Sequence, residues 1–176
     1  MKCVKIFGSK FSKRYIKEKD GLWLGFDEDN YLNSIIVEED KFSEEEIEEL
    51  VEQYRKWTRA YINDLPDQAF AYIEPCYKRG ETKNKNARHL PHHNEKVKDP
   101  NENSTVDIPH LRNALARVNQ IKPICPDTNR EKAINTAKRH LMKHARALLK
   151  TYQEKQSKFS NVERVFLEEI EKLLGE

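Results

Sequence analysis

The sequence predicts an α+β protein that is mainly helical, with a small N-terminal antiparallel sheet packed on a long helix and a C-terminal helical module. Two observations predict this class. Short aromatic and β-branched runs, separated by turn residues, fill the first 37 positions. Apolar residues at three- and four-residue spacing dominate the last third of the chain. The expected division is a sheet-and-helix part over residues 1–65 and a basic loop with a helical module over residues 66–176. The total length of 176 residues also suits one continuous domain.

The N-terminal sheet is predicted from four short runs of strand-forming residues. Asp20-Gly21 lies between two apolar runs, which is a hairpin signal. Gly8 and the polar segment 27–30 separate the other runs. The expected strands cover residues 3–7, 14–17, 22–26 and 31–37.

One long amphipathic helix is predicted over residues 43–64. Ser43 and Glu46 have the spacing of a capping box, in which each side chain accepts a backbone N–H of the other residue. The glutamates of the first turn lie at the positive end of the helix dipole, so helix stability accounts for much of their clustering. The apolar face that should pack on the sheet consists of Ile47, Leu50, Val51, Tyr54, Trp57, Tyr61 and Leu65.

The middle of the chain is predicted to form one strand followed by a long polar loop. Residues 69–73 alternate as a strand, and Pro75 ends it. Residues 78–105 are rich in Lys, Asn and Glu and predict a long loop. A loop of this length in a compact domain is either a working surface or a flexible insert.

Three helices are predicted in the last third. Asp107 can cap the first helix, with Pro109 in its first turn. Pro123 and Pro126 break the chain, and Asp127 or Thr128 begins a long second helix. A second capping box, at 160–163, begins the last helix, which should end near residue 175.

Acidic and basic residues are separated along the chain, although the formal net charge is only +2. Residues 38–52 hold nine acids and one lysine, a balance of −8, whereas residues 130–158 hold nine bases and two acids, a balance of +7. Such a dipolar surface can steer a polyanion toward its basic side.

Two sets of cations are the candidate nucleic-acid-binding residues. On the long second helix Arg139, Lys143, Arg146 and Lys150 recur at spacings of four, three and four, which places them on one side as a ridge that Lys138 flanks. The basic part of the polar loop could fold against that ridge and contact phosphates without reading bases. The loop set is Arg79, Lys83, Lys85 and Arg88, and the helix set is Lys138, Arg139, Lys143, Arg146 and Lys150.

The histidines allow two interpretations. His140 and His144 are four residues apart, so both imidazoles lie on one helix side and suit two metal ligands. The other candidate ligands are His89, His92 and His93. The ligand order is not a recognised one and the surrounding lysines oppose a dication, so we expect no bound metal and no other cofactor. The alternative is that an imidazole beside Pro91 pins an irregular loop by bonding to its backbone.

Catalysis has no signature in the chain, and whether it is an enzyme is left open. There is no Gly-x-Ser-x-Gly elbow and no phosphate-binding glycine run. Cys3, Cys76 and Cys125 are far apart and leave one cysteine unpaired in any disulfide scheme, so reduced cysteines in the cytoplasm are expected. No run approaches the 18 or so apolar residues of a membrane helix, so no membrane association is expected.

Three blocks of the sequence resemble a known module. These blocks are residues 88–94 (RHLPHHN), 106–120 (VDIPHLRNALARVNQ) and 137–145 (AKRHLMKHA). In this order they are similar to a small module that recurs in proteins of tailed phages and prophages, often beside head-morphogenesis or prohead-protease-type polypeptides. The similarity covers roughly residues 64–150. It implies a viral or mobile-element origin and a role in assembly or nucleic-acid handling, and it supplies no catalytic residues.

The leading functional hypothesis is a noncatalytic, virus-derived accessory protein that binds DNA or RNA through the loop and the helix ridge. It would act in the host cytoplasm or in the virion. One alternative is an assembly factor of phage morphogenesis, in which the acidic side of one copy meets the basic side of a neighbouring copy or of another phage protein. A second alternative is a histidine-rich, metal-dependent hydrolase or nuclease.

Overall fold

The computed structural model describes residues 1–7, 11–28, 31–54 and 57–175. The four expected N-terminal strands are confirmed, with bounds shifted by one or two residues at most ends. They pair antiparallel in the order β1-β4-β3-β2. The strands are β1 (Lys2–Ile6), β2 (Arg14–Lys19), β3 (Leu22–Phe26) and β4 (Leu32–Glu38).

The hairpin turn between β2 and β3 forms at Asp20-Gly21, as the sequence predicts. Gly21 has a φ of 76°, in the left-handed region that glycine adopts without strain. A Cβ at this position would lie 2.8 Å from Cδ of Lys41, so any side chain here would require the Lys41 side chain to move.

The single helix expected over residues 43–64 is wrong, because the structure has two helices there. Helix α1 (Glu44–Tyr54) begins with the predicted capping box, since the Ser43 N–H donates to Glu46 and the Glu46 N–H donates to Ser43 Oγ. Helix α2 (Arg59–Asp64) begins separately at Thr58, which is extended and accepts the N–H of Tyr61. This cap breaks the expected helix, and residues 55–56 lie outside the described residues.

The polar stretch after β5 (Phe70–Ile73) is also more regular than expected. Residues 88–91 form strand β6 (Arg88–Pro91), which pairs antiparallel with β5 in a two-stranded ribbon. Helix α3 (Pro75–Lys78) and short 3₁₀ turns at Asp67–Ala69 and Lys85–Ala87 flank the ribbon. Pairing with β5 gives the backbone groups of β6 their hydrogen-bond partners. The pattern of charged residues in the sequence does not reveal this pairing.

The three predicted C-terminal helices are confirmed. Helix α4 (Ile108–Arg117) is capped by Asp107, and helix α6 (Asn161–Gly175) begins with the capping box of Ser160 and Glu163. Helix α5 (Arg130–Glu154) begins after Asn129 rather than after Asp127 or Thr128, because the Asn129 side chain accepts the N–H of Lys132.

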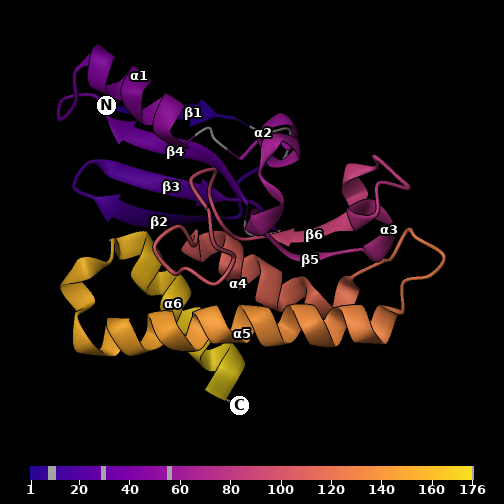
Figure 1. Cartoon of the computed structure of the whole chain (residues 1–176). Helices are drawn as coiled ribbons and strands as arrows, with labels where there is room; N and C mark the ends of the chain where they lie inside the picture. Colours follow the sequence, from indigo (N-terminus) through magenta and orange to yellow (C-terminus); the bar gives the residue numbers. More distant parts are fainter. Residues whose placement is uncertain (8–10, 29–30, 55–56, 176) are drawn as a thin grey trace.

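One hydrophobic core joins both expected parts of the chain. Leu22 and Ile35 of the sheet belong to the same buried cluster as Leu141 of α5 and Phe166 of α6. Figure 1 shows the sheet and the β5–β6 ribbon lying against a layer formed by α4, α5 and α6, with α5 running along the ribbon. α5 therefore packs against β5, and the segment that follows β6 reaches α5 where Nε2 of His92 lies 3.2 Å from Nε2 of His140.

No helix in the part of the chain described here combines the length and the apolar character needed to cross a bilayer.

Candidate functional site

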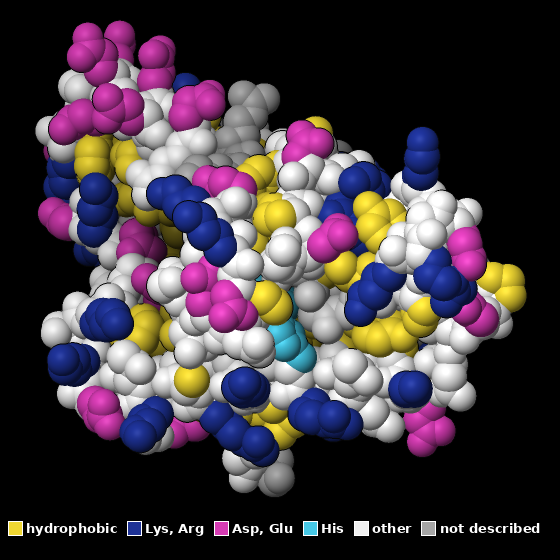
Figure 2. Space-filling view, in the orientation of Figure 1, with side chains coloured by type: hydrophobic (Ala, Val, Ile, Leu, Met, Phe, Trp, Pro, Cys, Tyr) yellow, Lys and Arg dark blue, Asp and Glu magenta, His cyan; other side chains and the backbone are white. Residues whose placement is uncertain are grey.

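Opposite charges lie on different parts of the surface. Figure 2 shows a cluster of acidic side chains over α1 and a row of basic side chains along α5 at the opposite edge of the molecule. The glutamates of α1 are exposed, as are the basic residues of α5. The acidic and basic residues that are separated along the sequence are therefore also separated on the surface of the folded protein.

The five helix cations predicted to bind nucleic acid are all exposed on α5. We call them the basic ridge: Lys138, Arg139, Lys143, Arg146 and Lys150. The buried side of the helix, which includes Ala137 and Leu141, faces the core. None of the five forms an ion pair with a carboxylate of the described residues. Over about 18 Å of helix, at about 1.5 Å per residue, these charges remain available to a ligand.

The loop cations lie away from the ridge. Arg79 is bound by two carboxylates, with Nε 2.6 Å from Glu81 and Nη2 2.6 Å from Asp127. Asp127 precedes α5, and Figure 1 places the segment around α3 at the end of the molecule where α5 begins. Lys83 is exposed, and the exposed Lys85 donates to the hydroxyl of Tyr77 at 3.2 Å.

Arg88 corrects the sequence prediction, because it is a buried structural residue. Only 5% of it is exposed. Its Nη1 donates to the carbonyl of Leu65 at 2.7 Å and its Nη2 to the carbonyl of Asn63 at 2.9 Å, while the guanidinium lies 4.1 Å from the ring centre of Phe70. A guanidinium engaged in this way is not available to a phosphate.

We expect Arg88→Met to lower the free energy of unfolding by about 2–4 kcal/mol, because it leaves buried carbonyls of the 62–65 segment without donors. Arg79→Met is the matched control, since the side chain of Arg79 is 47% exposed and solvated, so its loss should have a much smaller effect. Urea unfolding of both variants measures the difference. Equal, small effects would show that the buried contacts of Arg88 do not stabilise the fold.

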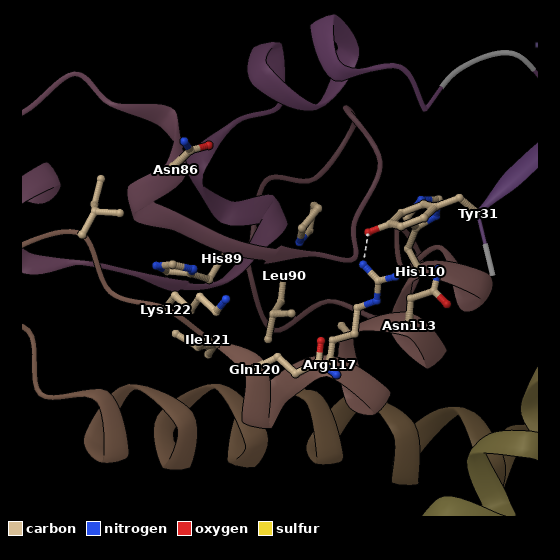
Figure 3. Close-up of a pocket in the computed structure, with 13 residues that line it drawn as sticks. Tyr31, Asn86, His89, Leu90, His110, Asn113, Arg117, Gln120, Ile121 and Lys122 are labelled. Atoms are coloured by element: carbon tan, nitrogen blue, oxygen red, sulfur yellow. Dashed lines mark hydrogen bonds between the residues drawn. The ribbon is translucent and has the colours of Figure 1, made fainter. Parts of the chain in front are cut away.

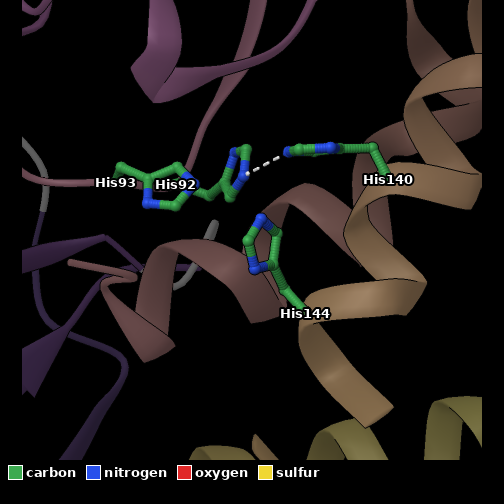
Figure 4. Close-up of side chains that lie close together, drawn as sticks. All are labelled: His92, His93, His140 and His144. Carbon is green, nitrogen blue, oxygen red and sulfur yellow. Dashed lines mark hydrogen bonds between the residues drawn. The ribbon is translucent and has the colours of Figure 1, made fainter. Parts of the chain in front are cut away.

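The structure brings four of the five candidate histidine ligands together. His92 and His93 follow the end of β6, and His140 and His144 lie one turn apart on α5. One ring nitrogen from each lies within 4.8 Å of the other three, and Figure 4 shows the rings converging. His92, His93 and His144 are buried, whereas His140 is half-buried. We call these four residues the histidine cluster.

The cluster pins the irregular segment that follows β6. Nδ1 of His92 lies 3.0 Å from the carbonyl oxygen of Leu90, so this nitrogen carries the proton and donates it. Nδ1 of His93 lies 2.9 Å from Oγ1 of Thr105, and Nδ1 of His144 lies 2.7 Å from Oδ1 of Asn103. This geometry confirms the predicted loop-pinning role for a histidine beside Pro91.

Burial lowers the pKa values of all four histidines of the cluster. It lowers the pKa of His92 well below the ordinary value, and the neighbouring His93 adds to the effect. The pKa values of His93 and His140 are lowered to about 4, again mainly by burial and then by His144. Burial also lowers the pKa of His144. The four imidazoles are therefore neutral near pH 7, and each keeps one lone pair on a ring nitrogen.

His89, the fifth candidate, is separate from the cluster and bonds to Glu74. Its Nε2 lies 2.7 Å from Oε1 of Glu74, which is fully buried at 0% exposure. The same carboxylate accepts the N–H groups of Ile124 and Cys125 and the hydroxyl of Thr128. Sequence reasoning missed this carboxylate clamp, because three of its four partners lie about 50 residues away.

The cysteines differ from expectation. Cys76 and Cys125 are joined by a disulfide across 49 positions of sequence, and Cys3 is free. The spacing alone favoured reduced cysteines, but the fold brings these two together beside the Glu74 clamp.

A pocket of about 450 Å³ lies between β6, α4 and the segment before α5. Figure 3 shows Tyr31 and Arg117 at one end, where Nη1 of Arg117 donates to the Tyr31 hydroxyl at 3.4 Å, and His89 at the other. Lys122 also lines the pocket, and its described wall has no carboxylate. The pocket is a second feature that sequence reasoning missed, since its lining residues come from four separate segments.

Comparison with known proteins adds no family to this geometry: no protein-family model, no curated protein and no solved structure matches the chain significantly.

Proposed function

We propose that this protein binds nucleic acid through the basic ridge of α5. The observation that carries the proposal is a row of exposed cations without carboxylate partners among the described residues. The likeness of three sequence blocks to a phage module supports a role in a virus or mobile element.

The binding mode follows from the chemistry of the ridge. Lysine and arginine side chains on a single straight helix face can contact successive phosphates, and such contacts are insensitive to base sequence. Neutralising four or five phosphates releases condensed counterions, so the logarithm of the affinity should fall with the logarithm of the salt concentration with a slope of about −4. The buried Arg88 and the paired Arg79 are not part of this surface.

The test is a double charge reversal, Lys143→Glu with Arg146→Glu. Both positions stand four residues from another ridge cation, so the new carboxylates gain helix ion pairs and the variant should fold. We expect affinity for duplex or single-stranded DNA and RNA at about 100 mM salt to fall on the order of 10- to 100-fold, because two phosphate contacts are replaced by repulsion. Fluorescence anisotropy across a salt series measures the affinity and its slope.

The matched control is Lys5→Glu with Lys13→Glu, which changes the net charge equally at exposed positions outside the ridge. The control should bind within about threefold of the unchanged protein if the ridge, rather than total charge, is the binding surface. Equal losses in the two variants would leave only non-specific attraction, and unchanged binding by the ridge variant would remove the ridge from the proposal.

Self-assembly is the second candidate function, favoured by the acidic surface of α1 at the opposite edge from the ridge in Figure 2. Such a dipole suits a head-to-tail contact between copies of the chain. Light scattering of nucleic-acid-free protein would then show oligomers that dissociate with salt, and the same ridge reversal would abolish them. A monomer at low salt would exclude this function.

A further inference from the structure

We propose that the histidine cluster binds one divalent transition-metal ion of the zinc class, held by His92, His93, His140 and His144 as a structural link between the end of β6 and α5. This inference is independent of the nucleic-acid proposal, because none of the four ligands belongs to the basic ridge.

The spacing of the ligands fits a four-coordinate shell. Nε2 of His92 and Nε2 of His140 lie 3.2 Å apart and point at each other in Figure 4. Tetrahedral zinc with Zn–N bonds of about 2.0–2.1 Å places its ligand nitrogens about 3.3 Å apart. One nitrogen from each of the other two histidines lies within 4.8 Å of these, so small ring rotations complete the shell.

The outward ring nitrogens are already held by oxygens, as they are in metal-binding histidines. Nδ1 of His92 faces the Leu90 carbonyl at 3.0 Å, Nδ1 of His93 faces Thr105 Oγ1 at 2.9 Å, and Nδ1 of His144 faces Asn103 Oδ1 at 2.7 Å. Bonds of this kind place the proton on Nδ1 and leave the Nε2 lone pair for the metal. Three of the four rings thus have the tautomer and orientation that ligation needs.

His93 and His144 each face two oxygens but have only one N–H group to donate. Both nitrogens of His93 face oxygen, yet a neutral imidazole has a single N–H. The Thr105 hydroxyl donates its proton to Oε1 of Glu102 at 3.2 Å, so it does not donate to His93. His144 has the same arrangement between Asn103 and Pro100. With both protons on Nδ1, the Nε2 lone pairs of His93 and His144 face the lone pairs of the Pro100 carbonyl, and a cation bound by these nitrogens would relieve the repulsion.

The surroundings decide which ion fits and how it enters. Imidazole nitrogens select zinc, cobalt, nickel or copper over magnesium and calcium, which prefer oxygen. Asp99 and Glu102 act electrostatically on His93 and offset the added charge, whereas Lys143 acts on His140 and opposes it. His140 and Pro100 also line a groove of about 320 Å³, which gives an ion a path from solvent.

Titration of chelator-treated protein with Co²⁺ and Zn²⁺ tests the site. We expect one equivalent of Co²⁺ to produce the visible d–d absorption of a tetrahedral ion, and an excess of Zn²⁺ to displace it. Saturating Zn²⁺ should raise the melting temperature by about 5 °C or more, because the ion binds only the folded state. His140→Ala removes the half-buried ligand and should weaken Co²⁺ binding at least tenfold while circular dichroism shows a folded protein.

His89→Ala is the matched control, since His89 lies on β6, three residues before the cluster begins, and bonds to Glu74 instead; this variant should bind Co²⁺ as the unchanged protein does. Failure of the unchanged protein to bind Co²⁺, Zn²⁺, Ni²⁺ or Cu²⁺ would overturn the site. Co²⁺ binding by His140→Ala with unchanged affinity, or near-ultraviolet bands of cobalt bound to thiolate, would overturn it as well, because the ligands would then be other residues.

Discussion

Glu74→Ala should lower the free energy of unfolding by about 3–5 kcal/mol, the range for removing one partner from a buried charged network. The carboxylate of Glu74 is fully buried and accepts from four donors, on His89, Ile124, Cys125 and Thr128. Burial tends to raise its pKa, but these bonds outweigh burial and lower it. The carboxylate is therefore charged and satisfied, and alanine leaves the buried N–H of Cys125 and three partly buried donors without this acceptor.

Urea unfolding of Glu74→Ala beside Glu81→Ala measures this effect. Glu81 is an exposed carboxylate that pairs with Arg79, so its loss should destabilise the fold far less than the loss of Glu74. Glu74→Gln keeps an acceptor oxygen and should fall between the two. If Glu74→Ala were as stable as Glu81→Ala, the clamp would not hold the segment before α5 in place.

Acid should destabilise the metal-free protein steeply between about pH 6.5 and pH 4. Burial holds the pKa values of His93 and His140 near 4, and those of His92 and His144 also lie below the ordinary value. In the unfolded chain the same rings take up protons near pH 6.5. The unfolded state thus binds more protons in this window, so the stability that the neutral rings provide is complete above pH 6.5 and is lost as the pH falls.

His93 and His140 alone give about two extra protons in the unfolded state near pH 5, so the free energy of unfolding should fall by at least about 2.7 kcal/mol per pH unit. Urea unfolding in chelator at a series of pH values measures this slope. His140→Gln removes one titrating ring and should reduce the slope by about 1.4 kcal/mol per pH unit. A free energy of unfolding that is flat across the window would mean that the rings are protonated in the folded protein.

Elements that depend on near neighbours could be predicted from the sequence. The capping boxes at Ser43 and Ser160 and the cap at Asp107 form as expected, because donor and acceptor lie three residues apart. The Asp20-Gly21 turn forms for the same reason. The exposed ridge of α5 also follows from local spacing, since a helix of fixed period places residues three or four apart on one side.

Features that depend on distant partners could not be predicted in this way. Arg88 has the composition of a surface loop cation, and only its contacts with Leu65 and Asn63, about 25 positions away, show that it is buried. Strand β6 forms because β5 supplies its backbone partners, and the break before α2 depends on a cap at Thr58 that the apolar spacing concealed.

The sequence by itself determined the fold class, most helix starts and the basic ridge, because each is set by interactions within a few residues of one helix or turn. Only the tertiary structure decided that His92 and His93 meet His140 and His144, that Cys76 meets Cys125, and that Glu74 becomes the acceptor for the segment before α5. These groups lie about 50 residues apart, and their convergence depends on how α5 packs against the β5–β6 ribbon, which no local pattern encodes.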